Sequence, residues 1–288
     1  MISAIKVHTP NTLAEAHEIL RQRGPQLHVL AGGTDLMVSL NMRLIAPREV
    51  LNIWGLDELR GVRLEGNILR IGALTTYTQL IRSPLVAKQC PMLVDAAKTI
   101  GAIQTQNRGT IGGNIVNASP AGDTLPVLAA CEATLEVGSH RGVRMIPFNR
   151  FYTGYRKTVL EADELLLAIR VPLQQPDERL FFYKLGTRRA QAISKVVMAA
   201  KAQIDCAQTI RSIHIGLGSV APTVIRARHT ESLLTGQLLT PTLIEQAKET
   251  IRQEIRPLTD FRSTEAYRRF ATGNLLGKFL RELVTAQG

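Results

Sequence analysis

The chain has 288 residues, enough for two or three compact domains, and its apolar content of 45% is sufficient for a globular core. Aromatic residues make up only 5%, which argues against the stacking platforms that bind single-stranded nucleic acid. The net charge of +11 comes from scattered lysines and arginines, so it favours an acidic protein partner or simple solubility over a nucleic-acid groove.

The three cysteines, Cys90, Cys131 and Cys206, are far apart in the sequence. Iron–sulfur clusters and structural zinc sites need several thiolates at close spacing, so this chain is expected to hold no metal of either kind. A sparse, odd number of cysteines favours a reducing compartment. No stretch approaches the roughly 20 apolar residues of a membrane span, and the first ten residues do not resemble a signal peptide. We therefore expect a soluble, cytoplasmic protein that does not associate with membranes.

Residues 1–58 have the pattern of a small α/β domain. Thr12 and Glu15 form a capping box, which predicts the start of a helix. A strand, a short helix capped by Thr34 and another strand are then expected at residues 27–30, 34–42 and 50–53.

Residues 59–175 are predicted to form a second domain of helices and antiparallel strands. A turn at Gly66 separates two runs of alternating side chains, 62–65 and 68–71, which indicates a hairpin. Helices are expected at residues 76–83, 91–100 and 123–130, the last capped by Asp123. Further strands are expected at residues 133–137, 143–146 and 165–171.

Residues 176–288 form the third predicted domain, and the boundary falls within a linker-like segment at residues 174–177. Three strands come first, at residues 180–185, 194–204 and 210–217. Helices follow at residues 230–235, 241–254 and 263–284. Strands followed by helices indicate an antiparallel sheet covered on one face, so the fold class of the whole chain is α+β.

Two glycine-rich stretches, residues 29–36 and residues 107–123, stand out from the rest of the chain. Glycine permits unusual backbone angles and close approach of a ligand. Successive exposed amides form a concave, partly positive surface that binds anions. Two such loops therefore indicate two contacts with one ligand that carries several phosphates, although each alone is also compatible with an ordinary tight turn.

Other catalytic motifs find little support. Residues 216–221 fit the loose pattern G-x-G-x-x-G/A, but no helical pattern follows Pro222 and no acidic residue stands about 20 positions on, so a Rossmann site is not expected. There is no nucleophile elbow and no cluster of histidines. If the chain belongs to an enzyme, a cofactor must carry the chemistry.

Sequence motifs in both stretches resemble one protein family: AGGTDL at residues 31–36 and TIGGNIVNASPAGD at residues 110–123. The chain resembles the FAD-binding subunits of the molybdenum hydroxylases, which include xanthine dehydrogenase and CO dehydrogenase. The likeness covers nearly the whole chain, and GYRKT at residues 154–158 is most similar to the xanthine dehydrogenase branch. It implies an α+β fold with two FAD-binding subdomains of the PCMH or CO dehydrogenase flavoprotein type and a C-terminal domain.

The resemblance also implies which residues contact FAD. The amides of residues 29–36 and the Thr34 hydroxyl would hold the pyrophosphate, and residues 110–114 would lie on the other side of the phosphates and the ribityl chain. The residues that match cofactor contacts of the family are Val29, Leu30, Ala31, Gly32, Gly33, Thr34, Asp35, Leu36, Ile100, Gly101, Thr110, Ile111, Gly112, Gly113, Asn114, Asp123, Leu166 and Lys184.

Several of these residues have a second interpretation. Asp123 could cap a helix, Leu166 could be a core residue of a strand, and Lys184 alone would be interpreted as a surface lysine. Ile100 departs from the aromatic residue of the xanthine dehydrogenases and cannot stack on a flavin. Residues 190–192 are Ala-Gln-Ala where those enzymes are acidic, which weakens NAD⁺ as the electron acceptor.

The partners implied by the resemblance are a large molybdopterin-binding subunit and a small [2Fe–2S] subunit, in a dimer of heterotrimers. Electrons would pass from the [2Fe–2S] clusters through FAD on this chain to NAD⁺ or another acceptor. The competing hypothesis is a non-catalytic basic binding module whose glycine loops are structural. A self-contained flavin oxidase would need a substrate-binding domain, for which 288 residues leave no room.

Overall fold

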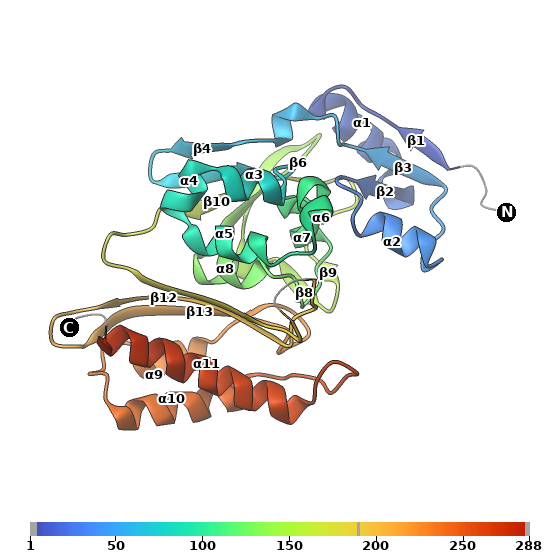
Figure 1. Ribbon diagram of the computed structural model, residues 1–288. Helices are drawn as coiled ribbons and strands as arrows, with labels where there is room; N and C mark the ends of the chain where they lie inside the picture. Colours follow the sequence, from blue (N-terminus) through green and yellow to red (C-terminus); the bar gives the residue numbers. More distant parts are fainter. Residues whose placement is uncertain (1–4, 189–190, 286–288) are drawn as a thin grey trace.

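The computed structural model describes residues 5–188 and 191–285. These residues contain three larger β-sheets, of three, five and four strands, and helices pack on each sheet (Figure 1). In the first sheet the strand order is β1-β3-β2, and both outer strands run parallel to β3. Its elements are β1 (Lys6–His8), α1 (Leu13–Arg23), β2 (Leu27–Leu30), α2 (Leu36–Asn41) and β3 (Glu49–Asn52). Half of the predicted capping box is present at α1: the Glu15 N–H donates to the Thr12 hydroxyl at 3.2 Å, but the Glu15 carboxylate accepts from the Asn11 N–H at 2.7 Å instead of the Thr12 N–H.

The second sheet is antiparallel, with the strand order β4-β5-β10-β6-β7. Its strands are β4 (Val62–Glu65), β5 (Ile68–Gly72), β6 (Thr134–Ser139), β7 (Gly142–Pro147) and β10 (Leu165–Pro172). Its helices are α3 (Tyr77–Arg82), α4 (Pro84–Gln89), α5 (Pro91–Lys98), α6 (Ile103–Arg108), α7 (Ile111–Val116) and α8 (Leu125–Ala130). A short pair, β8 (Tyr152–Gly154) and β9 (Lys157–Thr158), lies apart from this sheet.

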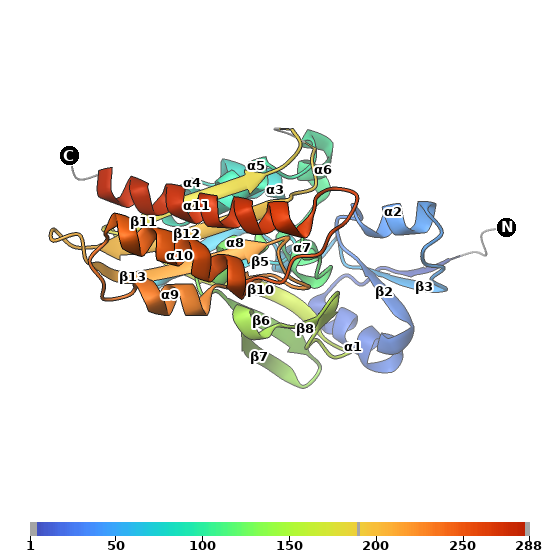
Figure 2. The ribbon, with the colours of Figure 1, turned by 90° about the horizontal axis from the view of Figure 1, so that it is seen from below.

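The third sheet lies between two layers of helices (Figures 1 and 2). Its antiparallel strands are β11 (Arg179–Leu185), β12 (Val196–Ile204), β13 (Ile210–Gly218) and β14 (Ile225–Arg226). One face packs against α9 (Arg228–Leu234), α10 (Pro241–Glu254) and α11 (Glu265–Thr285), and the other face against α5 and α8 of the second unit. Single-turn 3₁₀ helices cover residues Gly24–Gln26, Asp57–Leu59 and Phe148–Arg150.

Gly216 shows why the apparent dinucleotide motif has another explanation. A Cβ added there would lie 2.0 Å from the Pro126 carbonyl oxygen, so this glycine lets α8 pack closely on β13. The chain then runs through turns to β14, without a helix after Gly218. The Rossmann interpretation is therefore excluded by the local structure, as the sequence indicated.

Strand β10 joins the first two units. Leu165 and Leu167 are buried in a hydrophobic cluster with residues of the first unit, among them Leu20 and Leu51. Leu166 and Ile169 belong instead to the core of the second unit. Because successive side chains of a strand point to opposite faces, one strand contributes to both cores and fixes the first unit to the second.

The structure corrects several sequence-based expectations. The stretch around Gly112 is not an exposed loop: residues 111–116 form α7, and α6 was not anticipated either. Thr34 does not cap α2, because Asp35 occupies the N-cap position and makes no side-chain capping bond. Asp123 does not cap α8, whose N-cap residue is Thr124. Short helices rich in glycine or β-branched residues have weak intrinsic propensity, and here tertiary contacts determine them.

No helix in residues 5–188 or 191–285 is long and apolar enough to cross a membrane. Within those same residues, no group of three or more His, Cys, Asp or Glu side chains is arranged so that it could hold a metal ion.

Candidate functional site

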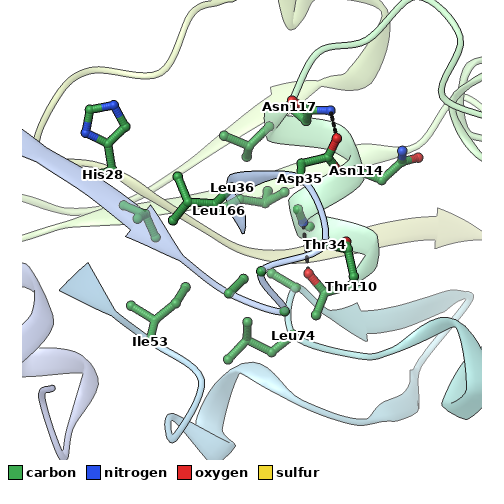
Figure 3. Close-up of a pocket in the computed structure, with 18 of the residues that line it drawn as sticks. His28, Thr34, Asp35, Leu36, Ile53, Leu74, Thr110, Asn114, Asn117 and Leu166 are labelled. Atoms are coloured by element: carbon green, nitrogen blue, oxygen red, sulfur yellow. Dashed lines mark hydrogen bonds between the residues drawn. The ribbon is translucent and has the colours of Figure 1, made fainter. Parts of the chain in front are cut away.

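A cavity of about 400 Å³ lies where the first unit meets the second (Figure 3). Pockets that bind small molecules or cofactors in proteins have volumes of this order. It gathers predicted residues from three distant parts of the chain: Val29, Ala31, Gly32, Gly33, Thr34, Asp35, Leu36, Thr110, Gly112, Gly113, Asn114 and Leu166. Residues 29–36, named here the first glycine segment, run from β2 into α2 along one wall.

The first glycine segment keeps its backbone donors available. In the described part of the chain, the N–H groups of residues 32–36 donate no hydrogen bond. Gly33 has φ +81°, in the left-handed region that glycine occupies without strain. Gly32 packs directly on the end of α6, since an added Cβ would lie 1.8 Å from the Arg108 carbonyl oxygen. The segment thus lines the cavity with residues whose amides, at positions 32–36, have no acceptor among the described residues, as a phosphate-binding loop requires.

The second glycine segment, residues 110–114, uses its donors inside the protein. The Ile111 and Gly112 N–H groups donate to the Thr75 and Ala73 carbonyl oxygens at 3.1 and 2.9 Å. The Gly113 N–H donates to the Thr110 hydroxyl oxygen at 3.1 Å, which caps α7 (Figure 3). The Asn114 N–H donates to the Thr110 carbonyl at 3.1 Å. The prediction of a second nest of exposed amides is therefore wrong, and this segment offers a ligand its side chains and its glycine Cα surfaces.

Polar side chains connect the two walls of the cavity. Asn117 Nδ2 donates to Asp35 Oδ1 at 3.0 Å, which joins α7 to the first glycine segment (Figure 3). The side-chain oxygen of Asn117, Oδ1, accepts a hydrogen bond from Arg156 Nη1 at 3.1 Å. The Asn114 side-chain oxygen accepts from the Thr124 hydroxyl at 2.6 Å, so its amide nitrogen is oriented with its hydrogens away from Thr124.

Asp123 and Lys184 form a buried ion pair beside α5. Lys184 Nζ lies 2.6 Å from Asp123 Oδ2 and donates to the Thr99 carbonyl oxygen at 2.9 Å. Asp123 Oδ1 is buried without a hydrogen-bond partner among the described residues. Burial raises the pKa of Asp123 to about 6, against the opposing effect of Lys184. Lys184 is therefore not a surface lysine, and the pair is charged only when the pH is near or above 6.

Six of the predicted cofactor residues do not line the cavity. Ile111 is fully buried in the core of the second unit, and Ile100 packs against that core. Gly101 adopts φ +51°, next to Thr105. The predicted residues outside the cavity lining are Leu30, Ile100, Gly101, Ile111, Asp123 and Lys184. Of residues 190–192, which the resemblance connects with the choice of electron acceptor, Ala190 lies outside the described residues.

Sequence reasoning missed several residues that line the cavity. Tyr77 is the most informative: it is 4% exposed, lines the cavity, and its hydroxyl makes no hydrogen bond to any described residue. Burial raises the pKa of Tyr77 well above its usual value, so the hydroxyl stays protonated as a donor. Glu164 also lines the cavity, held by Arg144 at 2.7 Å. No sequence motif distinguishes these two side chains from others nearby.

Comparisons with known proteins identify the family. The model of the FAD binding domain in molybdopterin dehydrogenase matches residues 3–174, and that of the CO dehydrogenase flavoprotein C-terminal domain matches residues 181–283. The chain belongs to the FAD-binding subunits of the molybdenum hydroxylases. The predicted resemblance, the fold class and FAD as the cofactor of this chain are thereby confirmed.

Relatives of known name match along nearly their entire length. The xanthine dehydrogenase FAD-binding subunit of Escherichia coli O157:H7 is 35% identical over 291 residues, which cover 100% of this chain and 99% of the relative. The carbon monoxide dehydrogenase medium chain of Hydrogenophaga pseudoflava is 33% identical, with 95% and 94% covered. A solved structure of carbon monoxide dehydrogenase from H. pseudoflava superposes with a TM-score of 0.93 at 31% identity, with 98% and 97% covered. The chain is accordingly an oxidoreductase subunit of the flavoprotein type.

The residues of this structure fit a FAD-binding subunit. A dinucleotide carries a pyrophosphate, and the unused amides of residues 32–36 provide donors for it at the cavity wall. Gly32 leaves no space for a side chain between that wall and Arg108. The structure thus supports the first glycine segment more strongly than the second as the place where phosphate oxygens are held.

Proposed function

We propose that this chain is the electron-transfer subunit of a molybdenum hydroxylase complex, which receives electrons from the [2Fe–2S] clusters of a partner subunit and passes them to NAD⁺ or another acceptor. The observation that supports this proposal is the cavity between the two units, walled by a glycine segment in which the amides of residues 32–36 have no acceptor among the described residues. FAD, when bound, supplies the ability to accept electrons singly and release them as a pair.

The first glycine segment is proposed to bind the pyrophosphate through the amides of residues 32–36 and the Thr34 hydroxyl. Thr110 and Asn114 would contact the cofactor from the opposite wall with their side chains. The Thr110 oxygen already accepts from Gly113, so its own hydrogen is free to be donated to a ligand. Leu166 would contribute an apolar contact from β10.

Asp123 and Lys184 are proposed to act near the flavin ring, beside Ile100 and Gly101. Lys184 is held in place by two acceptors, Asp123 Oδ2 and the Thr99 carbonyl. An ammonium fixed in a buried position stabilises negative charge that develops nearby, because the surroundings screen it weakly. Leu30 and Ile111 would support the two walls from behind, since Ile111 is wholly buried.

The other cofactors are assigned to partner subunits. We propose a large subunit that binds molybdopterin and a small subunit that binds [2Fe–2S], assembled as a dimer of heterotrimers. The molybdenum cofactor named for the H. pseudoflava enzyme agrees with such a division. The net charge of +11 provides a basis for docking against acidic partner surfaces. A cytoplasmic location remains a prediction of the sequence.

We also propose a division of the chain at residues 1–58, 59–175 and 176–288. Three separate hydrophobic clusters support it: one around Leu20 and Leu51, one around Leu93 and Leu128, and one around Ile215 and Leu276. Leu165 and Leu167 of β10 enter the first of these clusters, so the first unit depends on the second for part of its core.

The test begins with the purified chain and FAD. We expect the chain to bind FAD without a covalent link, so that acid precipitation releases a flavin that chromatography identifies as FAD. Reconstitution with both partner subunits should then allow a hydroxylase substrate to bleach the flavin absorption, whereas the isolated chain should not respond to substrate. Oxidation of a purine or aldehyde by the isolated chain with its own flavin would contradict the assignment to an electron-transfer subunit.

A further inference from the structure

Trp54, the sole tryptophan of the chain, has the guanidinium groups of two arginines over its ring. The Arg60 and Arg108 Cζ atoms are 4.3 and 3.8 Å from the centre of its ring. The three residues come from different elements: Trp54 follows β3, Arg60 follows the 3₁₀ helix Asp57–Leu59, and Arg108 ends α6. An arginine over the face of tryptophan at this distance is an attractive cation–π contact.

Arg60 is fixed at the junction of the first two units by several bonds. Its Nη1 donates to the Leu74 carbonyl oxygen at 3.1 Å, its Nη2 donates to the Trp54 carbonyl oxygen, and its Nε lies 3.2 Å from Asp57 Oδ1. Arg60 and the half-buried ring therefore form a rigid base next to Ile53 and Leu74, both of which line the cavity.

Arg108 is held differently. Its guanidinium donates no hydrogen bond to any described residue, so the Trp54 ring is the contact that orients it. Its backbone, in contrast, touches the cavity wall from behind: the carbonyl oxygen abuts Gly32, and the next two residues, Gly109 and Thr110, lead into α7. In Figure 1, α6 lies at the side of the second unit that faces β2 and β3.

We propose that the stack of Trp54 on Arg108 is a positioning device that holds the first glycine segment against residues 108–110 and thereby sets the affinity for FAD. The stack connects the end of β3 to the residue on which Gly32 rests, so it fixes the spacing of the two cavity walls. This inference rests on the FAD-binding role of the chain. Trp54 and Arg108 are positioning residues, since neither lines the cavity.

The experiment uses the full chain freed of flavin and titrated with FAD, with quenching of Trp54 emission and flavin absorption as readouts. Arg108→Gln removes the charge but keeps much of the side-chain length, and Trp54→Leu removes the ring. Each should raise the Kd for FAD about tenfold, the size expected for loss of one cation–π contact together with the positioning it provides. Every variant that lacks Trp54 has no tryptophan, so the absorption readout alone is used for those variants.

The matched control is Arg82→Gln, which makes the same charge change at an exposed arginine that ends α3, without an aromatic contact among those described. It should leave the Kd within about twofold, so a general charge effect is separated from the stack. The double variant of Trp54 and Arg108 should bind no more weakly than either single variant, because the two residues act as one unit.

Urea unfolding of each flavin-free variant distinguishes positioning from folding. If Arg108→Gln does not fold, Trp54→Phe decides the question, because it keeps a flat ring with a weaker π face and should raise the Kd about threefold. The inference would be overturned if both Arg108→Gln and Trp54→Leu bound FAD with a Kd within twofold of the wild type. If these two variants do not fold, a Kd within twofold for Trp54→Phe would overturn it. Failure of the wild-type chain to bind FAD would instead contradict the proposed function.

Discussion

The two glycine segments look alike in the sequence but differ in what their glycines do. In the first segment, residues 29–36, the amides of residues 32–36 have no acceptor among the described residues, and all five of these residues line the cavity. In the second, residues 110–114, the amides of residues 111–114 all donate to protein oxygens. Both segments contain a glycine that packs closely on backbone, Gly32 on Arg108 and Gly112 on Ala73, but only the first segment keeps its amides free for a ligand. A motif that marks a binding site therefore does not by itself say which of its groups bind.

The largest expected effect is a loss of stability when a side chain is added to Gly112 in the second segment. Gly112→Val places a Cβ 2.7 Å from the Ala73 carbonyl oxygen and 2.7 Å from the Ala73 Cβ, and backbone there cannot move aside. We expect the unfolding free energy of the flavin-free chain to fall by about 4 kcal/mol or more, measured by urea unfolding. Gly33→Ala is the matched change in the first segment: its Cβ meets only flexible side chains, and its φ of +81° costs about 1–2 kcal/mol.

A stable Gly112→Val chain that has lost FAD would show that the second segment, like the first, is reserved for the ligand. Loss of more stability in Gly33→Ala than in Gly112→Val would reverse the comparison altogether.

The second expected effect concerns Asp123, which follows the second segment. Burial raises its pKa to about 6, from 3.8 for the free side chain. A carboxyl group with a raised pKa contributes stability that is complete below pH 3.8 and is lost as the pH rises through about 6. Relative to Asp123→Asn, which does not titrate, the wild type should lose up to about 3 kcal/mol of unfolding free energy between about pH 4 and pH 7. Parallel stability profiles for the two proteins would show that Asp123 ionises normally.

The third expected effect compares two threonines. Thr110 caps α7 by accepting from the Gly113 N–H, so Thr110→Ala should cost about 1 kcal/mol of stability in urea unfolding. Thr34 makes no hydrogen bond to the described residues, so Thr34→Ala should change stability by less than about 0.5 kcal/mol. Its effect should appear in the Kd for FAD, about fivefold weaker, as expected for one lost hydrogen bond. An unstable Thr34→Ala chain with normal FAD affinity would contradict this division of roles.

The smallest expected effect concerns Tyr77, between the two segments. Tyr77→Phe removes a hydroxyl without a described protein partner and keeps the ring against which Gly109 packs. We expect unchanged urea unfolding and a Kd for FAD about two- to fivefold weaker, since the hydroxyl would donate to the cofactor. An unchanged Kd would show that Tyr77 only fills space beneath Gly109.

Much of the fold could be predicted because its patterns are local. The hairpin of β4 and β5 and the helix α10 follow from side-chain periodicity and capping residues. Helix α7 could not be predicted, since glycine weakens helices and its stability comes from bonds to Ala73 and Thr75, more than 30 positions earlier in the chain.

The candidate site was predictable only where a family motif marks it. The motif locates the first glycine segment, Thr110 and Asn114, all of which line the cavity except Leu30. It does not locate Tyr77 or the contact of Trp54 with Arg108, because these depend on how separate elements meet in space. The burial of Lys184 against Asp123, 61 positions away, is likewise a property of the packed structure.

Amide hydrogen exchange with and without FAD tests the central claim most directly. In the flavin-free chain, the amides of residues 32–36 should exchange rapidly, and those of residues 111–114 should be protected by their protein acceptors. Addition of FAD should slow exchange in the first segment by about tenfold or more and leave the second almost unchanged. Equal protection of both segments before FAD is added, or a FAD-dependent change confined to residues 111–114, would contradict the account.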